Sequence, residues 1–81
     1  MSTIVDTETA LGRRAVDELL ERYVSWREEC RTVEHSYEVW IAADRGERTL
    51  AYAAYLAALD REEHAARSYA HHVQRVGRMA R

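Results

Sequence analysis

The chain lacks proline, phenylalanine, lysine and asparagine, and its 81 residues include only three glycines and one cysteine. The single cysteine, Cys30, excludes a disulfide framework and a four-cysteine zinc module. A net charge of −2 without lysine excludes a basic nucleic-acid-binding arm, and a hydrophobic content of 47% excludes a disordered polyelectrolyte. The longest uncharged stretch, residues 49–59, is too short to cross a bilayer.

Residue usage and the first residues indicate where the protein works. Residues 1–6 contain no basic segment followed by an apolar core, so we expect no signal peptide and a cytoplasmic location. All twelve cationic residues are arginine and thirteen residues are alanine, which is the usage of a GC-rich bacterial genome or of a phage of such a host. The length allows one domain.

The few helix breakers divide the chain into two helices and a turn. Helix-forming residues fill both sides of Gly46, which predicts a helix over about 7–43, a turn at about 44–47 and a helix over about 48–78. Asp44 and Glu47 have the spacing of a capping box for the second helix, and Gly46 could alternatively cap the first. The predicted fold is all-α, with residues 1–81 forming one antiparallel two-helix hairpin.

Apolar residues recur alternately three and four positions apart in both segments. In the first segment they are Val16, Leu19, Tyr23, Trp26, Cys30, Val33, Tyr37 and Trp40. In the second segment the stripe consists of Tyr52, Tyr55, Leu59, Glu62, Ala66, Tyr69, Val73, Val76 and Ala80, with Glu62 as its one polar member. A period of 3.5 residues predicts that the helices pack side by side through these stripes.

A lone hairpin covers only one side of each helix, which predicts self-association. Residues 50–59 are apolar on every face of a helix, and such a segment normally requires burial on more than one side. We therefore expect a homodimer that forms a four-helix bundle. The expected interface residues are Trp26, Trp40, Tyr52, Tyr55, Leu56, Leu59 and Tyr69. A monomer whose N-terminal segment folds back over the seam is the alternative.

Charge is divided unevenly between the two halves. Residues 1–44 contain ten acids and five arginines, a net charge of −5, whereas residues 45–81 contain four acids and seven arginines, a net charge of +3. This asymmetry favours an antiparallel hairpin and an antiparallel dimer with unlike helices as neighbours.

A carboxylate and imidazole group near the middle of the hairpin could bind a metal ion. The spacing around the turn places Glu28 and Glu29 opposite Glu62, Glu63 and His64, and four-helix bundles can hold metals with inward carboxylates and histidines. The typical Glu-x-x-His spacing on one helix does not occur. A structural role is the competing interpretation, in which Glu62 pairs across the seam with an arginine, Arg27 or Arg31, and fixes register.

The remaining candidates favour ordinary structural roles. His64, His71 and His72 are expected to be solvated, and Cys30 is expected to be a packing residue on the seam. Arg75, Arg78 and Arg81 could form a basic ridge for nucleic acid, which is a second alternative. No glycine-rich phosphate loop or serine nucleophile motif occurs.

The sequence thus predicts a non-catalytic helical protein-protein interaction module, such as an adaptor, a regulator or an accessory subunit. It is expected to act as a homodimer with a further protein partner, without a cofactor and without a membrane segment. A metal-binding four-helix assembly and weak nucleic-acid binding stand as the alternatives.

Overall fold

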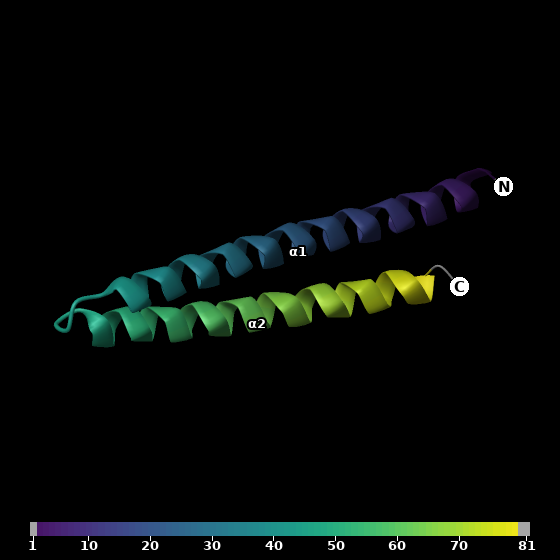
Figure 1. The fold of residues 1–81 in the computed structure, drawn as a ribbon. Coiled ribbons are helices and arrows are strands. Elements are labelled where there is room, and N and C mark those ends of the chain that lie inside the picture. The colour runs from purple at the N-terminus through teal and green to yellow at the C-terminus, as the bar shows by residue number, and fades with distance from the viewer. Residues whose placement is uncertain (1, 80–81) are drawn as a thin grey trace.

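Two long antiparallel helices and the turn that joins them form the described chain (Figure 1). The computed structural model describes the backbone of residues 2–79 and the side chains of residues 10–79. Helix α1 comprises Ser2–Ala42 and helix α2 comprises Arg48–Met79, and residues 2–79 contain no strand. The hairpin measures 69 × 14 × 12 Å. The prediction of an all-α helical hairpin is therefore confirmed.

The ends of the helices differ in detail from the predicted ones. Helix α1 begins at Ser2, five residues before the expected start at Thr7, and it ends one residue earlier than expected, at Ala42. The amide of Ala43 donates to the carbonyl oxygen of Trp40 at 3.2 Å, so the last turn of α1 is tightened.

Backbone hydrogen bonds shape the turn. The amide of Glu47 donates to the carbonyl oxygen of Asp44 at 2.9 Å, and the amide of Ala51 donates to the carbonyl oxygen of Glu47 at 3.0 Å. The second of these is the first bond of α2. The backbone of Gly46 has no positive φ, so the alternative prediction that Gly46 caps the end of α1 in a left-handed conformation is wrong. Within residues 10–79 the carboxylate of Asp44 caps no amide, so the predicted capping box does not form.

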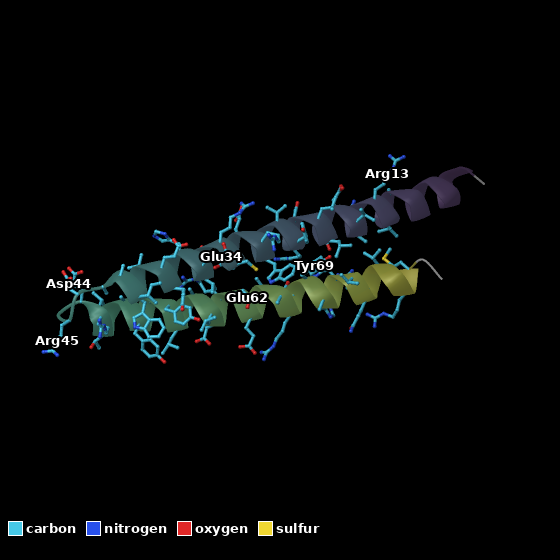
Figure 2. The ribbon with its side chains drawn as sticks, in the orientation of Figure 1. Arg13, Glu34, Asp44, Arg45, Glu62 and Tyr69 are labelled. Carbon is cyan, nitrogen blue, oxygen red and sulfur yellow. The ribbon has the colours of Figure 1, made fainter. Side chains whose placement is uncertain are left out.

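Aromatic stacking and small residues hold the two helices together. Trp26 stacks on Tyr69 with ring centroids 5.5 Å apart, and Trp40 stacks on Tyr55 with centroids 5.4 Å apart. Figure 2 shows Tyr69 on the side of α2 that faces α1. Ala58 has an exposed fraction of 0%, so it is completely covered within the hairpin.

Every second member of each predicted stripe is half-buried between the two helices. These members, here called the seam row, are Leu19, Trp26, Val33 and Trp40 on α1 and Tyr55, Glu62, Tyr69 and Val76 on α2. On one side of this row the seam is completed by smaller or polar residues, among them Ala15, Ser36, Ala51, Ala58 and Ala65. The other half of the stripe lies on the opposite side.

Neither α1 nor α2 contains a run of residues that is both long enough and apolar enough to span a lipid bilayer, as judged over the described residues. Ala80, the last member of the predicted stripe, lies outside the part of the chain that the structure describes.

Candidate protein-interaction surface

The outward half of the two stripes forms a continuous row on each helix, here called the apolar flank. Its members recur at every seventh position and are Val16, Tyr23, Cys30 and Tyr37 on α1 and Tyr52, Leu59, Ala66 and Val73 on α2. The three tyrosines and the two valines of this row are exposed by 42–45%. Cys30, Leu59 and Ala66 are half-buried. This row is therefore a candidate for an interaction surface.

Both rows of the apolar flank lie on the same side of the hairpin. Each flank residue precedes a seam-row residue by three positions, as Tyr23 precedes Trp26 and Tyr52 precedes Tyr55. A spacing of three positions rotates the flank residue by about 60° around the helix axis from the seam-row residue, in the same sense on both helices. Because the helices are antiparallel, an equal turn in the same sense points both rows to one side of the plane that contains the two axes (Figure 1).

A second row continues the same side outward and is here called the outer row. Its members follow the flank residues by four positions and are Leu20, Arg27, Glu34 and Ile41 on α1 and Leu56, Glu63, Ala70 and Gly77 on α2. Leu20, Ile41 and Leu56 belong to the exposed large apolar side chains. The outer row therefore widens the apolar surface and adds three charges to it, of which only Glu63 has an ion-pair partner within residues 10–79, Arg67 one turn away.

Two aromatic clusters position the tyrosines of the flank. Tyr23 contacts Trp26 and Tyr69, with centroid distances of 6.1 and 5.5 Å. Two heptads nearer the turn, Tyr37 contacts Trp40 and Tyr55 at 6.0 and 5.7 Å. Each tyrosine thus packs one side of its ring on the seam and leaves the rest open. Rings held in this way lose little further conformational entropy on binding.

The opposite side of the hairpin carries the ion pairs between the helices, together with exposed apolar residues such as Leu11 and Val39. Glu29 lies 3.5 Å from Arg61, and Glu18 lies 3.8 Å from Arg75 and 3.9 Å from His72, so all ion pairs between the helices within residues 10–79 are on this side. These pairs join the acidic α1 to the basic α2, as the charge division predicts. The ion pairs between the helices and the apolar flank therefore lie on different sides of the hairpin.

The residues that the sequence nominated for the interface fall into two groups. Trp26, Trp40, Tyr55 and Tyr69 belong to the seam row and contact one another within the hairpin. Tyr52, Leu56 and Leu59 lie on the apolar flank and the outer row. Tyr23 and Tyr37, which lie on the apolar flank, were not among the interface residues expected from the sequence. Their heptad spacing is visible there, but one stripe does not tell which of its halves the second helix covers.

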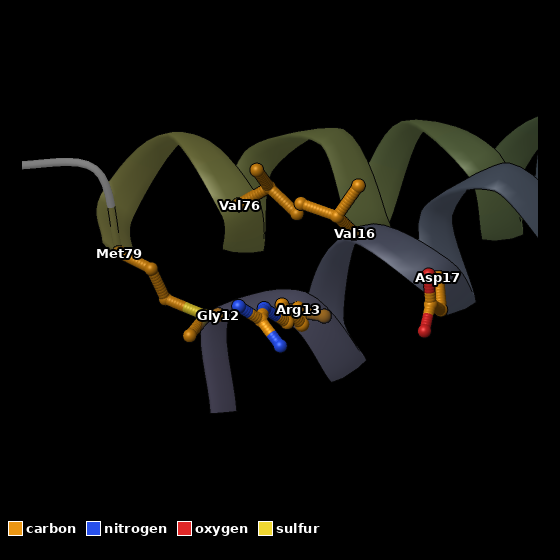
Figure 3. Close-up of a pocket in the computed structure, with 7 residues that line it drawn as sticks. Gly12, Arg13, Val16, Asp17, Val76 and Met79 are labelled. Atoms are coloured by element: carbon orange, nitrogen blue, oxygen red, sulfur yellow. The ribbon is translucent and has the colours of Figure 1, made fainter. Parts of the chain in front are cut away.

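An apolar hollow of about 490 Å³ lies at the open end of the hairpin, where the helices diverge (Figure 3). Val16, Val76 and Met79 line it, and Gly12 leaves room because no atom lies within 4 Å of where a Cβ would be. Val16 also belongs to the apolar flank. The hollow thus extends this flank to the end of the described helices.

Glu62 has a different partner from the predicted one. Its carboxylate accepts a hydrogen bond of 2.8 Å from the indole Nε1 of Trp26 and forms no ion pair with Arg27 or Arg31 among residues 10–79. Figure 2 shows Glu62 on the side of α2 that faces α1. The bond ties positions 26 and 62 together in the middle of the hairpin and thereby fixes register. The sequence-based prediction named only arginines as contacts of Glu62.

The proposed metal ligands do not converge within one chain. No three histidine, cysteine, aspartate or glutamate side chains within residues 10–79 lie close enough to hold one metal ion. Glu29 contacts Arg61, Glu63 contacts Arg67 and Glu62 contacts Trp26. Each of these carboxylates therefore has a separate structural partner. Glu28 and His64 are exposed and form no ion pair or side-chain hydrogen bond within the same range.

The histidines and the arginines of the proposed ridge differ in their exposure and contacts. His64 and His71 are exposed, whereas the His72 side chain is only 14% exposed, so the expectation of a solvated His72 is wrong. Its Nδ1 donates to the carbonyl oxygen of Ser68 at 2.8 Å, which holds the ring against α2. Arg78 is exposed, and Arg81 lies outside the described residues.

Neither a family model, nor a curated protein, nor a solved structure matches the chain. The apolar flank and the charges beside it are therefore the features from which a function can be inferred.

Proposed function

We propose that this chain is a non-catalytic helical protein-protein interaction module that acts as a homodimer through its apolar flank. The observation that carries the proposal is the segregation of the hairpin into a charged side, where the helices pair by charge, and an apolar side whose tyrosines and valines are exposed by 42–45%. Water-exposed apolar residues in a continuous row favour docking of another chain.

The area of this surface supports a stable interface. The exposed parts of the large apolar side chains on the flank and the outer row add up to roughly 700 Å² per chain, close to the ~800 Å² per partner that standard protein interfaces bury. These side chains are Val16, Leu20, Tyr23, Tyr37, Ile41, Tyr52, Leu56 and Val73. A surface of this size is unusually large for a chain of 81 residues to leave in water.

The thin core of the single hairpin supports the same proposal. Only Ala15 and Ala58 are buried among residues 10–79, and no large side chain there is fully buried. A small chain with so little buried surface needs oligomerisation or another staple to be stable. A second hairpin on the apolar flank would supply the missing half of the core.

Sedimentation equilibrium over the micromolar concentration range tests the proposal. We expect the mass of a dimer, with dissociation only on dilution. A monomer mass throughout this range would refute self-association. Sedimentation is the appropriate measurement because it needs no substitution and no label.

The metal-binding and nucleic-acid alternatives have weaker support. The carboxylates nominated as ligands contact Trp26, Arg61 and Arg67 instead of one another. In the arginine ridge, Arg75 lies 3.8 Å from Glu18, so part of its charge is balanced within the hairpin.

A further inference from the structure

The facing rows of α1 are self-complementary about one residue, Cys30. From residue 20 to residue 41, the order along the flank and the outer row is Leu20, Tyr23, Arg27, Cys30, Glu34, Tyr37 and Ile41, and Val16 precedes this stretch. Read from either end, the stretch is apolar, tyrosine and charge, with opposite charges on the two sides of the centre. A two-fold axis at Cys30 therefore brings tyrosine to tyrosine, aliphatic residue to aliphatic residue, and arginine to glutamate.

The rows of α2 are complementary in size about their own centre. Tyr52, Leu56 and Leu59 lie near the turn, and Ala66, Ala70 and Val73 lie toward the end of α2. The pairs Tyr52 with Val73, Leu56 with Ala70 and Leu59 with Ala66 are all centred on about residue 63. A two-fold axis there places each bulky side chain against a smaller one, as dense packing requires.

The two centres lie at nearly the same height in the folded hairpin. Glu29 contacts Arg61, and Tyr37 contacts Tyr55, so Cys30 is level with about residues 60–62 of α2. The centre of the α2 rows, at about residue 63, lies one to three residues from this height, or about 1.5–4.5 Å. A single axis can therefore pass close to both centres, which the sequence of either helix alone does not reveal.

From this juxtaposition, and resting on the proposed function, we infer that the partner of the apolar flank is a second copy in reversed direction. The two-fold axis passes near Cys30 and is perpendicular to the long axis of the hairpin. Helix α1 packs against α1 of the other copy, α2 packs against α2, and the two turns lie at opposite ends. Arg27 of each copy then pairs with Glu34 of the other.

Charge permits this contact between like helices despite the acidic character of α1. In the facing rows of α1 the only charged residues are Arg27 and Glu34, so these rows are locally neutral. The acids that pair with α2, Glu18 and Glu29, lie on the other side of the hairpin. Glu63, the one charge in the facing rows of α2, is paired with Arg67 of its own helix.

The competing arrangement has its two-fold axis along the hairpin and both turns at the same end. It places α1 against α2 of the other copy, so that Tyr37 and Ile41 meet Tyr52 and Leu56 at one end. At the other end, Ala66, Ala70 and Val73 of α2 lie opposite Leu20 and Tyr23 of α1. The competing arrangement therefore gathers its contacts between large residues at one end, and crowding there destabilises an interface.

Oxidation of the unmodified protein gives the first test. Diamide takes two electrons and two protons from a pair of thiols, so neighbouring Cys30 side chains form a disulfide and the diamide is reduced to its hydrazine. We expect a covalent dimer on a non-reducing gel. The control is the chain with Cys30→Ser and Thr32→Cys, whose thiol lies at the same height on the charged side; it should stay uncross-linked under the same conditions. Equal cross-linking of the two chains overturns the inference.

A distance between the two turns gives the second test. Gly46 has no atom within 4 Å of a built Cβ and no positive φ, so Gly46→Cys in a Cys30→Ser chain can take a spin label without strain. The inferred dimer separates the labels by roughly 45–50 Å, whereas the competing arrangement brings them within about 20 Å. A short distance in a dimer overturns this inference and leaves the proposed function intact. A monomer in sedimentation refutes both.

Discussion

The strongest single test of the apolar flank is a pair of identical substitutions on opposite sides of the hairpin. Val73 lies on the flank and is exposed by 44%, and Val39 lies on the other side, at a heptad position equivalent to Glu18, and is exposed by 46%. Val73→Glu and Val39→Glu therefore make the same change in charge, volume and helix propensity at the same exposure. Only their relation to the apolar flank differs.

The structure gives the expected size of the effect. The exposed part of Val73 is roughly 65 Å², and its burial by a second chain stabilises the complex by about 1.6 kcal/mol. A two-fold dimer contains two such residues, so their loss costs about 3 kcal/mol, which is roughly a hundredfold in the dissociation constant. The unpaired carboxylate adds a desolvation cost. We therefore expect Val73→Glu to weaken self-association at least a hundredfold.

Sedimentation equilibrium of both variants provides the measurement, with circular dichroism to check that each remains helical. Val39→Glu should dissociate within about threefold of the unmodified protein, because surface substitutions outside an interface usually change free energies by less than about 0.5 kcal/mol. Equal dissociation constants for the two variants would refute the assignment of the interface to the flank. A monomeric Val39→Glu with a dimeric Val73→Glu would place the interface on the charged side.

Three further predictions concern the hairpin itself. Ala58→Leu places a bulky side chain at a fully buried position and should lower the free energy of unfolding by about 1–3 kcal/mol, measured by thermal denaturation at fixed concentration. Ala57→Leu, one residue away and exposed, should change stability little, and equal effects of the two substitutions would show that the packing around Ala58 is not tight. Trp26→Phe removes the hydrogen-bond donor to Glu62 and should lower the free energy of unfolding by about 1–3 kcal/mol. Adding Glu62→Leu should recover at least half of that loss, because both polar partners are then gone, and a further loss would mean that Glu62 stabilises the seam in another way. Excess zinc, iron or manganese should leave the denaturation midpoint unchanged, since the nominated carboxylates contact other side chains; a rise of several degrees would restore the metal-binding alternative.

Much of the fold could be predicted because it follows from local chemistry. The absence of proline and the scarcity of glycine leave two long segments of helix formers with a break near Gly46. The period of 3.5 residues in the apolar stripes then requires the helices to lie side by side. Charge division gave the correct sign of the pairing between α1 and α2, as the contacts of Glu18 and Glu29 show.

The candidate surface could be predicted only in part. Tyr52, Leu56 and Leu59 were nominated because residues 50–59 are apolar on all sides, and they do lie on the flank or the outer row. Tyr23 and Tyr37 were not nominated, since the same stripe contains Trp26 and Trp40 and a stripe does not say which members the second helix covers. The hydrogen bond between Trp26 and Glu62 could not be predicted, because it forms only when the indole ring of Trp26 lies opposite Glu62 in the folded hairpin.

The sequence by itself thus determined two helices, an antiparallel turn and an excess of apolar positions over what one hairpin can bury, because propensity and periodicity act over neighbouring residues. Only the tertiary structure decided how far each helix is rotated about its axis. With this rotation Ala58 is fully buried, whereas Val16, Tyr23, Tyr37, Tyr52 and Val73 are exposed on one side. It also decided the height at which α1 and α2 align, which brings the centre at Cys30 level with that of α2. Rotation and alignment depend on contacts between residues of different helices, such as Tyr37 with Tyr55 and Glu29 with Arg61, and no local pattern contains them.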